Sequence, residues 1–283
     1  MQGWRFYNHA AIPEGSPLSG VDLSPVEDGT IWKAEGERPL LARWTTDFDC
    51  DCESQWWYVI KDTPFDPAAL KAKRRYEINK GQKNFEVRIL DPRDCKEALY
   101  RVQVAAFSAY PSKYRPTVNK ESFFAQTETW GKGTLVLGAF SRETGALSGY
   151  ALLVEKDRNF VSFNVLKTDP AFEKYGVNAA LVEKALDCYS DFLKNGGILC
   201  DGERNINHET AFQDYLQKYF GFRKAYCRLH IAYNPKIRWI VRLLYPFRRL
   251  LCKLDSIRPV HKVNAVLKME TICRAKNATE EKR

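Results

Sequence analysis

The clearest alternation of apolar and polar positions lies at Phe160–Thr168, where apolar side chains at every second position share one face. Period 2 is typical of a strand, and Pro170, which cannot donate to a sheet ladder, is expected to follow its end. Residues 178–193 carry apolar side chains at helical spacing, with Gly176 before them and Gly196 after them. This stretch therefore predicts a strand, a turn and a helix, and the unpaired N–H groups at a helix start attract anions.

Similar patterns on both sides predict the other elements of the chain. The β-prone or alternating segments are residues 31–33, 40–44, 55–60, 85–90, 134–140, 146–156, 198–201 and 222–233. The segments with helical periodicity are residues 68–80, 94–110, 117–130 and 209–220. Asp66 and Pro67 are suited to cap and start the first of these helices, and Gly81 is expected to end it.

From residue 85 to residue 234, this order resembles the core of the GNAT acyl-CoA N-acyltransferase superfamily. The resemblance is carried by Pro170, Gly176, Val177 and Leu181, and by the turn at residues 221–223. It implies an α+β fold with a central mixed, mostly antiparallel sheet flanked by helices. Two positions depart from the family loop, because Glu173 and Asn178 stand where the family has Arg or Gln and Gly or Ala.

The resemblance also implies an activity and a binding site. The implied reaction moves an acyl group, expected to be acetyl, from acyl-CoA to an amine by direct attack on the thioester. The family's CoA contacts carry over to the end of the central strand, the loop, the helix start and the segment after the fifth strand. The matching residues are Val165, Lys167, Lys174, Tyr175, Gly176, Val177, Asn178, Asn205 and Asn207.

Three side chains are candidates for the chemistry itself. Asn164 lies on the polar face of the central strand, which offers no carboxylate. Asp201, at the end of the next predicted strand, is the first candidate for the base that accepts the amine proton, and Glu203 is the alternative. Tyr219 is the candidate acid for the leaving thiolate, although the family position is occupied by Gln217. The alternative for both carboxylates is surface solvation or capping of the following helix, which is the more common role of Asp.

The chain before residue 85 suggests two other interpretations. Its basic helix, with Lys71, Lys73, Arg74, Arg75 and Lys80, is similar to a helix of FemAB-type transferases, which consist of two GNAT-like lobes. That resemblance implies aminoacyl-tRNA as the donor and a cell-envelope precursor as the acceptor. The GNAT resemblance allows any small amine as the acceptor. The third interpretation is an inactive GNAT-like binding module. The predicted domains are a partial lobe at 1–84, an acyltransferase domain at 85–235 and a tail at 236–283.

The net charge of +9 is concentrated in that tail, which holds 13 Lys and Arg against 4 Asp and Glu. Residues 236–254 interleave basic side chains with large apolar ones, and Pro246 is expected to interrupt their helix. This pattern predicts either packing on the body or contact with an anionic membrane.

No run of about 18 apolar residues is present, and residues 1–9 lack the apolar run of a secretory signal. The eight cysteines are scattered, and no metal site is expected from their spacing. We therefore expect a protein of the reducing cytoplasm, with peripheral contact to the inner face of the membrane.

Overall fold

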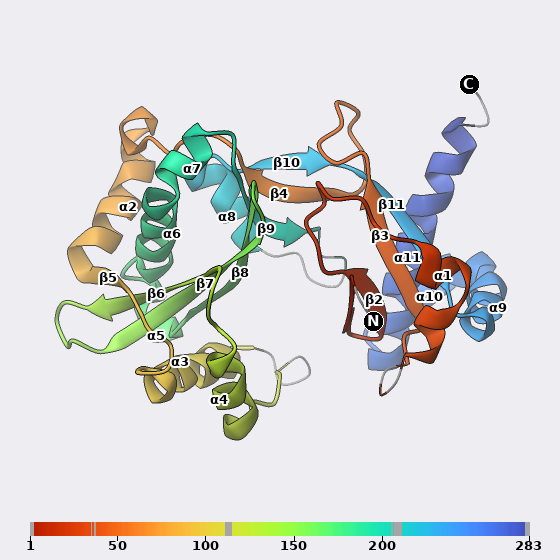
Figure 1. Ribbon diagram of the computed structural model, residues 1–283, viewed down its shortest axis with the longest axis horizontal. Coiled ribbons are helices and arrows are strands. Elements are labelled where there is room, and N and C mark those ends of the chain that lie inside the picture. The colour runs from red at the N-terminus through yellow and green to blue at the C-terminus, as the bar shows by residue number, and fades with distance from the viewer. Residues whose placement is uncertain are drawn as a thin grey trace. The chain divides into compact units, whose positions relative to one another are not determined.

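The computed structural model describes residues 3–34, 36, 38–110, 115–204, 206 and 211–280 (Figure 1). The chain forms two compact units, and both contain segments from distant parts of the sequence. The first unit combines Met1–Val59, Glu203–Ala211 and Lys224–Arg283, and the second combines Ile60–Gly202 and Phe212–Arg223. The predicted boundary between residues 84 and 85 falls inside the second unit.

The first unit contains a four-stranded sheet in the order β1-β2-β3-β11. Its strands are β1 (Trp4–Tyr7), β2 (Ala10–Pro13), β3 (Leu41–Thr46) and β11 (Arg228–Tyr233). β2 and β3 run parallel, and the other neighbours are antiparallel. A short α1 (Ser24–Glu27) and the 3-10 helix η1 (Thr30–Lys33) complete a small core around Trp4, Ile31 and Ala42.

The tail helices also belong to the first unit. They are α9 (Pro235–Leu244), the 3-10 helix η3 (Tyr245–Phe247), α10 (Arg248–Cys252) and α11 (Arg258–Glu280). Pro246 lies in η3, so the predicted interruption is confirmed. The buried side chains of Val241 and Leu267 pack against Leu41 and Tyr233 of the sheet, and this contact joins the tail to the body of the unit.

A seven-stranded sheet in the order β10-β4-β9-β8-β7-β6-β5 contributes most of its strands to the second unit. Its strands are β4 (Trp57–Lys61), β5 (Phe85–Ile89), β6 (Thr134–Ser141), β7 (Leu147–Asp157), β8 (Phe160–Thr168), β9 (Ile198–Glu203) and β10 (Arg223–Tyr226). β5 to β8 are antiparallel neighbours, and β8 and β9 are parallel. The predicted fold class, a mixed and mostly antiparallel sheet flanked by helices, is confirmed.

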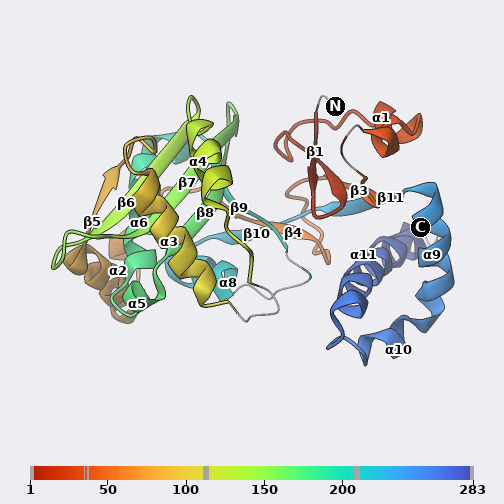
Figure 2. The same cartoon turned by 90° about the horizontal axis from the view of Figure 1, so that it is seen from below.

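Helices cover both faces of this sheet (Figures 1 and 2). They are the 3-10 helix η2 (Pro67–Ala69), α2 (Ala72–Asn84), α3 (Lys96–Ser108), α4 (Lys120–Glu128), α5 (Pro170–Glu173), α6 (Val177–Cys188), α7 (Ser190–Lys194) and α8 (Ala211–Phe220). α3 and α4 pack on one face, where Leu99, Val102 and Phe123 surround Tyr150. α6 packs on the other face, and α2 lies against α6.

Several local predictions differ from the structure. Asp66 and Pro67 start the 3-10 helix η2 and not α2, and the helix expected at residues 178–193 is divided into α6 and α7. The single strand expected at residues 222–233 is two strands in two different sheets, because the chain leaves the seven-stranded sheet after β10, at the buried Cys227, and enters the four-stranded sheet as β11. The strand expected at residues 31–33 is a 3-10 helix. Gly81 does not end a helix, since α2 continues through it to Asn84.

Gly81 continues the helix because α2 touches α6 at this point, backbone against backbone. A Cβ atom on Gly81 would lie 2.7 Å from the carbonyl oxygen of Gly176 and 2.9 Å from the amide nitrogen of Ala180. Gly176 has a φ of +89°, in the left-handed region that favours glycine, and a Cβ there would lie 2.9 Å from the Gly81 nitrogen. Both glycines are therefore needed for the close approach of the two helices.

We expect Gly81→Ala to destabilise the protein, although alanine is ordinarily the better helix former. Helix propensity alone predicts a gain of about 1 kcal/mol in the free energy of unfolding. Overpacking against the backbone of Gly176 is expected to cost about 1–3 kcal/mol, so the net change should be a loss. Urea denaturation measures the sign directly.

The matched control is Gly131→Ala, because a Cβ on Gly131 meets nothing within 4 Å. This variant should unfold at the same urea concentration as the natural protein. If Gly81→Ala were equally stable or more stable, α2 and α6 would be able to separate without cost and the contact would not constrain the fold.

Candidate active site

The candidate site begins where β8 and β9 stop pairing. Their pairs run from Phe160 and Ile198 to Ser162 and Cys200. β8 continues to Thr168, and within the described part of the chain its only partner beyond Ser162 is β7. The backbone N–H and C=O groups on the open side of β8 therefore have no ladder partner, and such an edge can bind an extended or carbonyl-containing ligand.

A β-bulge lies at the start of this open edge. Leu153 pairs with Phe163 and Leu152 with Val165, which leaves Asn164 as the extra residue in β8. The Asn164 side chain is exposed, and its Oδ1 accepts a hydrogen bond from Ser162 Oγ at 3.4 Å. Bulges interrupt the ladder and re-aim side chains, and they are frequent beside active sites. Asn164 is thus the bulged residue at the start of the open edge of β8. Its catalytic role stays a prediction.

Asp201 lies on β9, one residue beyond the last pair with β8. Its Oδ2 accepts a hydrogen bond from Gln213 Nε2 of α8 at 3.3 Å. Burial raises the pKa of the Asp201 carboxyl to about 7, and the Gln213 hydrogen bond acts in the opposite direction. A carboxylate that titrates near neutral pH has the property required of a general base.

Glu203, the alternative base, has a different environment in the first unit. Its carboxylate forms an ion pair with Arg43, and Oε2 also accepts a hydrogen bond from Trp56 Nε1 at 3.0 Å. The Arg43 guanidinium lies 5.6 Å from the centroid of the Trp56 ring. These contacts give Glu203 a structural role, so Asp201 is the better candidate for the base.

Tyr219 lies in an aromatic cluster of α8. The Tyr219 ring centroid lies 5.0 Å from the Tyr215 ring centroid and 5.2 Å from the Lys218 ammonium group. Tyr219 follows Gln213 by six residues, which corresponds to about 9 Å along the helix axis. No contact of Tyr219 with Asp201 is present in the described structure, and its predicted role as an acid rests on the sequence alone.

Val165 and Lys167 follow the bulge on β8 and lie against α3. Val165 packs on the cluster that contains Tyr150, whose hydroxyl donates a hydrogen bond to Gln103 Oε1 at 2.6 Å. The Lys167 ammonium group lies 4.8 Å from the ring centroid of Phe107. Their side chains are thus occupied by α3, and it is their backbone that remains available at the open edge.

The resemblance predicts a phosphate site at the turn before α6, and two N–H groups of this turn already have partners. The N–H of Tyr175 donates to the carbonyl of Phe172, and the N–H of Gly176 donates to the carbonyl of Glu173 at 3.0 Å. Gly176 and Val177 are buried, and the close approach that Gly176 permits is to α2. Two of the N–H groups that the resemblance assigns to a CoA pyrophosphate are therefore engaged within the turn itself, and the contact with CoA stays a prediction.

The other predicted residues of the turn have partners of their own. Asn178 Oδ1 accepts a hydrogen bond from Thr168 Oγ1 at 3.2 Å, which ties the start of α6 to the end of β8. Lys174 is exposed, and its ammonium group lies 4.9 Å from the centroid of the Tyr175 ring. Asn205 and Asn207 lie outside the described residues.

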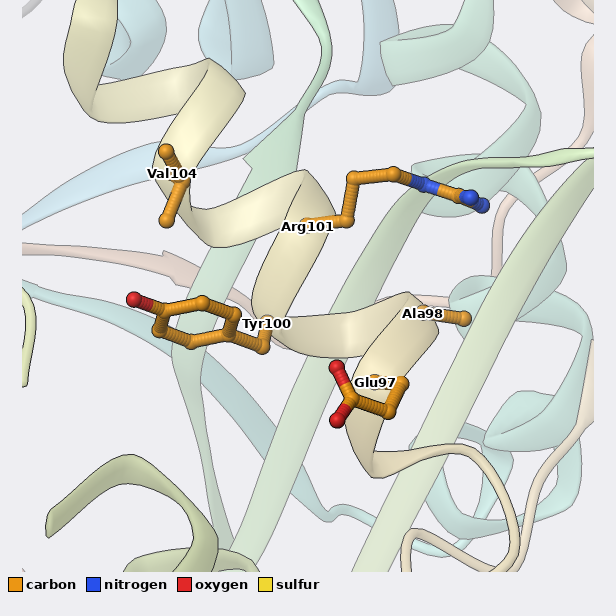
Figure 3. Close-up of a pocket in the computed structure, with 5 residues that line it drawn as sticks. All are labelled: Glu97, Ala98, Tyr100, Arg101 and Val104. Atoms are coloured by element: carbon orange, nitrogen blue, oxygen red, sulfur yellow. The ribbon is translucent and has the colours of Figure 1, made fainter. Parts of the chain in front are cut away.

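An open depression of about 490 Å³ lies elsewhere in the second unit, along one helix (Figure 3). All of its lining residues belong to α3: Glu97, Ala98, Tyr100, Arg101 and Val104. Figure 3 shows Tyr100 and Val104 pointing to one side of the helix and Arg101 to the other. Glu97 forms an ion pair with Lys120 at 2.6 Å. None of the predicted site residues lines this depression.

Sequence reasoning missed Gln213, which the structure places on the candidate base. A polar residue in the first turn of a helix has no distinctive pattern, and only the fold brings it to β9. No cluster of three or more His, Cys, Asp or Glu residues suited to a metal occurs in the described ranges. In the same ranges, no helix is both long and apolar enough to cross a membrane.

No family model matches the sequence, and no curated protein matches it. Solved structures do resemble the fold. The protein called L-PGS from Bacillus licheniformis is 12% identical, with 85% of this chain and 83% of that chain covered and a TM-score of 0.48. The C-terminal domain of a putative lysylphosphatidylglycerol synthetase from Agrobacterium fabrum is 10% identical, with coverages of 84% and 82% and a TM-score of 0.48.

A GCN5-related N-acetyltransferase-like protein from Streptococcus suis is 12% identical to the chain. The match covers 73% of this chain and 67% of that chain, with a TM-score of 0.36. These are similarities of low identity.

The raised pKa of Asp201 predicts a pH dependence of stability. Its folded-state pKa of about 7 lies above the ordinary value of 3.8, so between these two values the folded chain binds more protons than the unfolded chain. The contribution of this carboxyl to the free energy of unfolding therefore falls as the pH rises from about 4 to about 7, and it is constant above that.

Asp201→Asn keeps the side-chain shape but cannot ionise. Relative to the natural protein, this variant should gain on the order of 1–3 kcal/mol in the free energy of unfolding between pH 4.5 and pH 8. Urea denaturation at both pH values measures the gain. The control is Asp214→Asn, which replaces an exposed carboxyl on α8; an equal gain in both variants would contradict a special environment for Asp201.

Proposed function

We propose that the chain is an acyltransferase that joins an acyl group to an amine. The observation that carries the proposal is the open edge of β8 beside Asp201, a half-buried residue whose carboxyl pKa is raised to about 7. Acyl transfer to an amine needs a donor of hydrogen bonds for the carbonyl oxygen and a group that accepts the amine proton. The site supplies both kinds of group from neighbouring strands.

In the proposed reaction, a backbone N–H of the open edge between Val165 and Lys167 donates to the acyl carbonyl oxygen and stabilises the charge that develops there. The amine nitrogen attacks the carbonyl carbon, and a C–N bond forms. Asp201 accepts the amine proton, directly or through water. The bond to the leaving sulfur or oxygen then breaks, and the leaving group takes up a proton, for which Tyr219 is the predicted source and water the alternative.

The donor predicted from the GNAT resemblance is acyl-CoA, and acetyl-CoA is the simplest case. An extended pantetheine arm is suited to pair with an unpaired strand edge. Two features of the turn before α6 weaken the case for this donor: the N–H groups of Tyr175 and Gly176 are engaged, and Glu173 adds a negative charge. The contact that would hold the CoA phosphates stays a prediction.

The second candidate donor is aminoacyl-tRNA, and the surface of α2 favours it. Lys73, Arg75 and Lys83 are exposed on this helix, and Arg74 and Lys80 are half-buried. None of these five side chains forms an ion pair with the residues that the structure describes. Basic groups without an acidic partner suit a polyphosphate backbone. The acceptor amine, of a small molecule or an envelope precursor, stays a prediction.

We expect the donor to be identified by binding measured with acetyl-CoA, a longer acyl-CoA and charged tRNA. If the donor is tRNA, binding should weaken as the salt concentration rises. The double substitution Lys73→Gln with Lys83→Gln should reduce the slope of log K against log salt by about two, because two phosphate contacts are lost. The matched control neutralises two exposed basic residues elsewhere, Lys132 and Arg158. Binding of neither donor would favour the inactive binding module and contradict the proposal.

With the donor in hand, Asp201→Asn should lower kcat by roughly 10²–10⁴-fold and change KM much less, because a general base acts in the transition state. The kcat of the natural protein should rise with pH through about 7, as the Asp201 carboxyl loses its proton.

Gln213→Leu removes the hydrogen bond that lowers the pKa of Asp201, so the inflection of the pH profile of kcat should move to higher pH. A pH profile unchanged by both substitutions would exclude Asp201 as the base.

A further inference from the structure

The tail presents six exposed large apolar side chains between residues 239 and 254, from α9, η3, α10 and the turn after α10. We name this set the outer face of α9 and α10. Its members are Trp239, Ile240, Leu243, Phe247, Leu250 and Leu254. Trp239 is 69% exposed, Leu243 is 70% exposed and Leu250 is 60% exposed. Large apolar side chains are rarely exposed together on a soluble surface without a binding role.

The inner side of the same helices is fully used by the fold. Val241 is buried, and it packs with Ile237, Leu244 and Leu251 on the core of the first unit. α10 and α9 also contact α11, which lies beside them in Figure 2. The outer face is therefore not a core surface that a small rearrangement would bury, because these helices already have a packed side.

Charge distinguishes this face from an ordinary apolar patch. Residues 235–254 contain six basic residues and no Asp or Glu. Lys236, Arg238, Arg242, Arg249 and Lys253 are exposed, and none of them forms an ion pair with any described residue. The Arg242 guanidinium lies 5.8 Å from the ring centroid of Trp239, so positive charge borders the aromatic side chain directly.

We propose that the outer face of α9 and α10 docks the protein on an anionic lipid bilayer. The apolar side chains would enter the interface between headgroups and acyl chains, and the basic side chains would contact anionic headgroups. A second copy of the chain is disfavoured because a symmetric contact would bring two such basic faces together. Nucleic acid is disfavoured because exposed leucine and isoleucine add little to a base or phosphate contact.

The test is co-sedimentation of the full chain with vesicles of phosphatidylcholine, with and without one third phosphatidylglycerol. We expect binding to the anionic vesicles at low salt, with release as salt rises. Leu243→Ser with Leu250→Ser should weaken this binding by tenfold or more. Arg242→Gln with Arg249→Gln should weaken it by roughly 25-fold, about fivefold for each charge. All four side chains are exposed, so the variants should fold; unchanged thermal unfolding checks this.

The matched controls are Ile89→Ser, which removes an apolar side chain that is 65% exposed on β5, and Arg158→Gln. Neither should change vesicle binding. The proposal would be overturned by a chain that stays in solution with anionic vesicles, or by binding insensitive to the leucine variants. Retention by nucleic acid in place of vesicles, or a dimer abolished by Leu243→Ser with Leu250→Ser, would also overturn it.

Discussion

The contact between Gly81 and Gly176 is the constraint on which the second unit depends. A Cβ on either residue would lie within 3 Å of the other helix's backbone, so α2 can lie against the start of α6 only because both positions lack a side chain. This contact fixes the helix that precedes β5 and the turn that follows β8. It also occupies one side of that turn, because the close approach that Gly176 permits is made to α2.

The separation of β8 and β9 has two consequences that belong together. It leaves the edge of β8 without a ladder partner, which costs stability unless solvent or a ligand satisfies those groups. It also places Asp201 beyond the last residue of β9 that pairs with β8, where burial disfavours its charged form. Both features are unfavourable for a structure whose only requirement is stability. Their occurrence side by side on neighbouring strands is the pattern expected when a fold gives up stability for a site.

The sequence alone was sufficient to predict those elements whose residue pattern is local. β8 begins and ends where the alternation at Phe160–Thr168 predicts, and the interruption at Pro246 follows from the missing N–H of proline. Features that depend on distant residues could not be predicted in this way. Gly81 looks like a helix end until α6 is present, and the break at Cys227 follows only from the existence of two sheets.

The candidate site shows the same division. Asp201 and Asn164 could be selected from the sequence because their strands were recognisable, but the bulge that isolates Asn164 is a property of its pairing with β7. Gln213, the partner of Asp201, comes from a helix that begins ten residues after it in the chain. The choice between Asp201 and Glu203 required the structure, since only the fold shows that Arg43 and Trp56 already hold Glu203.

The tail shows why two interpretations of one pattern need not exclude each other. A helix with apolar residues at one spacing buries one side, and Ile237, Val241 and Leu244 follow that spacing in α9. Trp239, Ile240 and Leu243 occupy the opposite side, where a helix that only completes a core would carry polar residues. The inner side accounts for why the tail folds with the first unit. Within the described residues, the apolar side chains of the outer side are not explained by packing on the first unit. The basic side chains beside them point to an anionic surface.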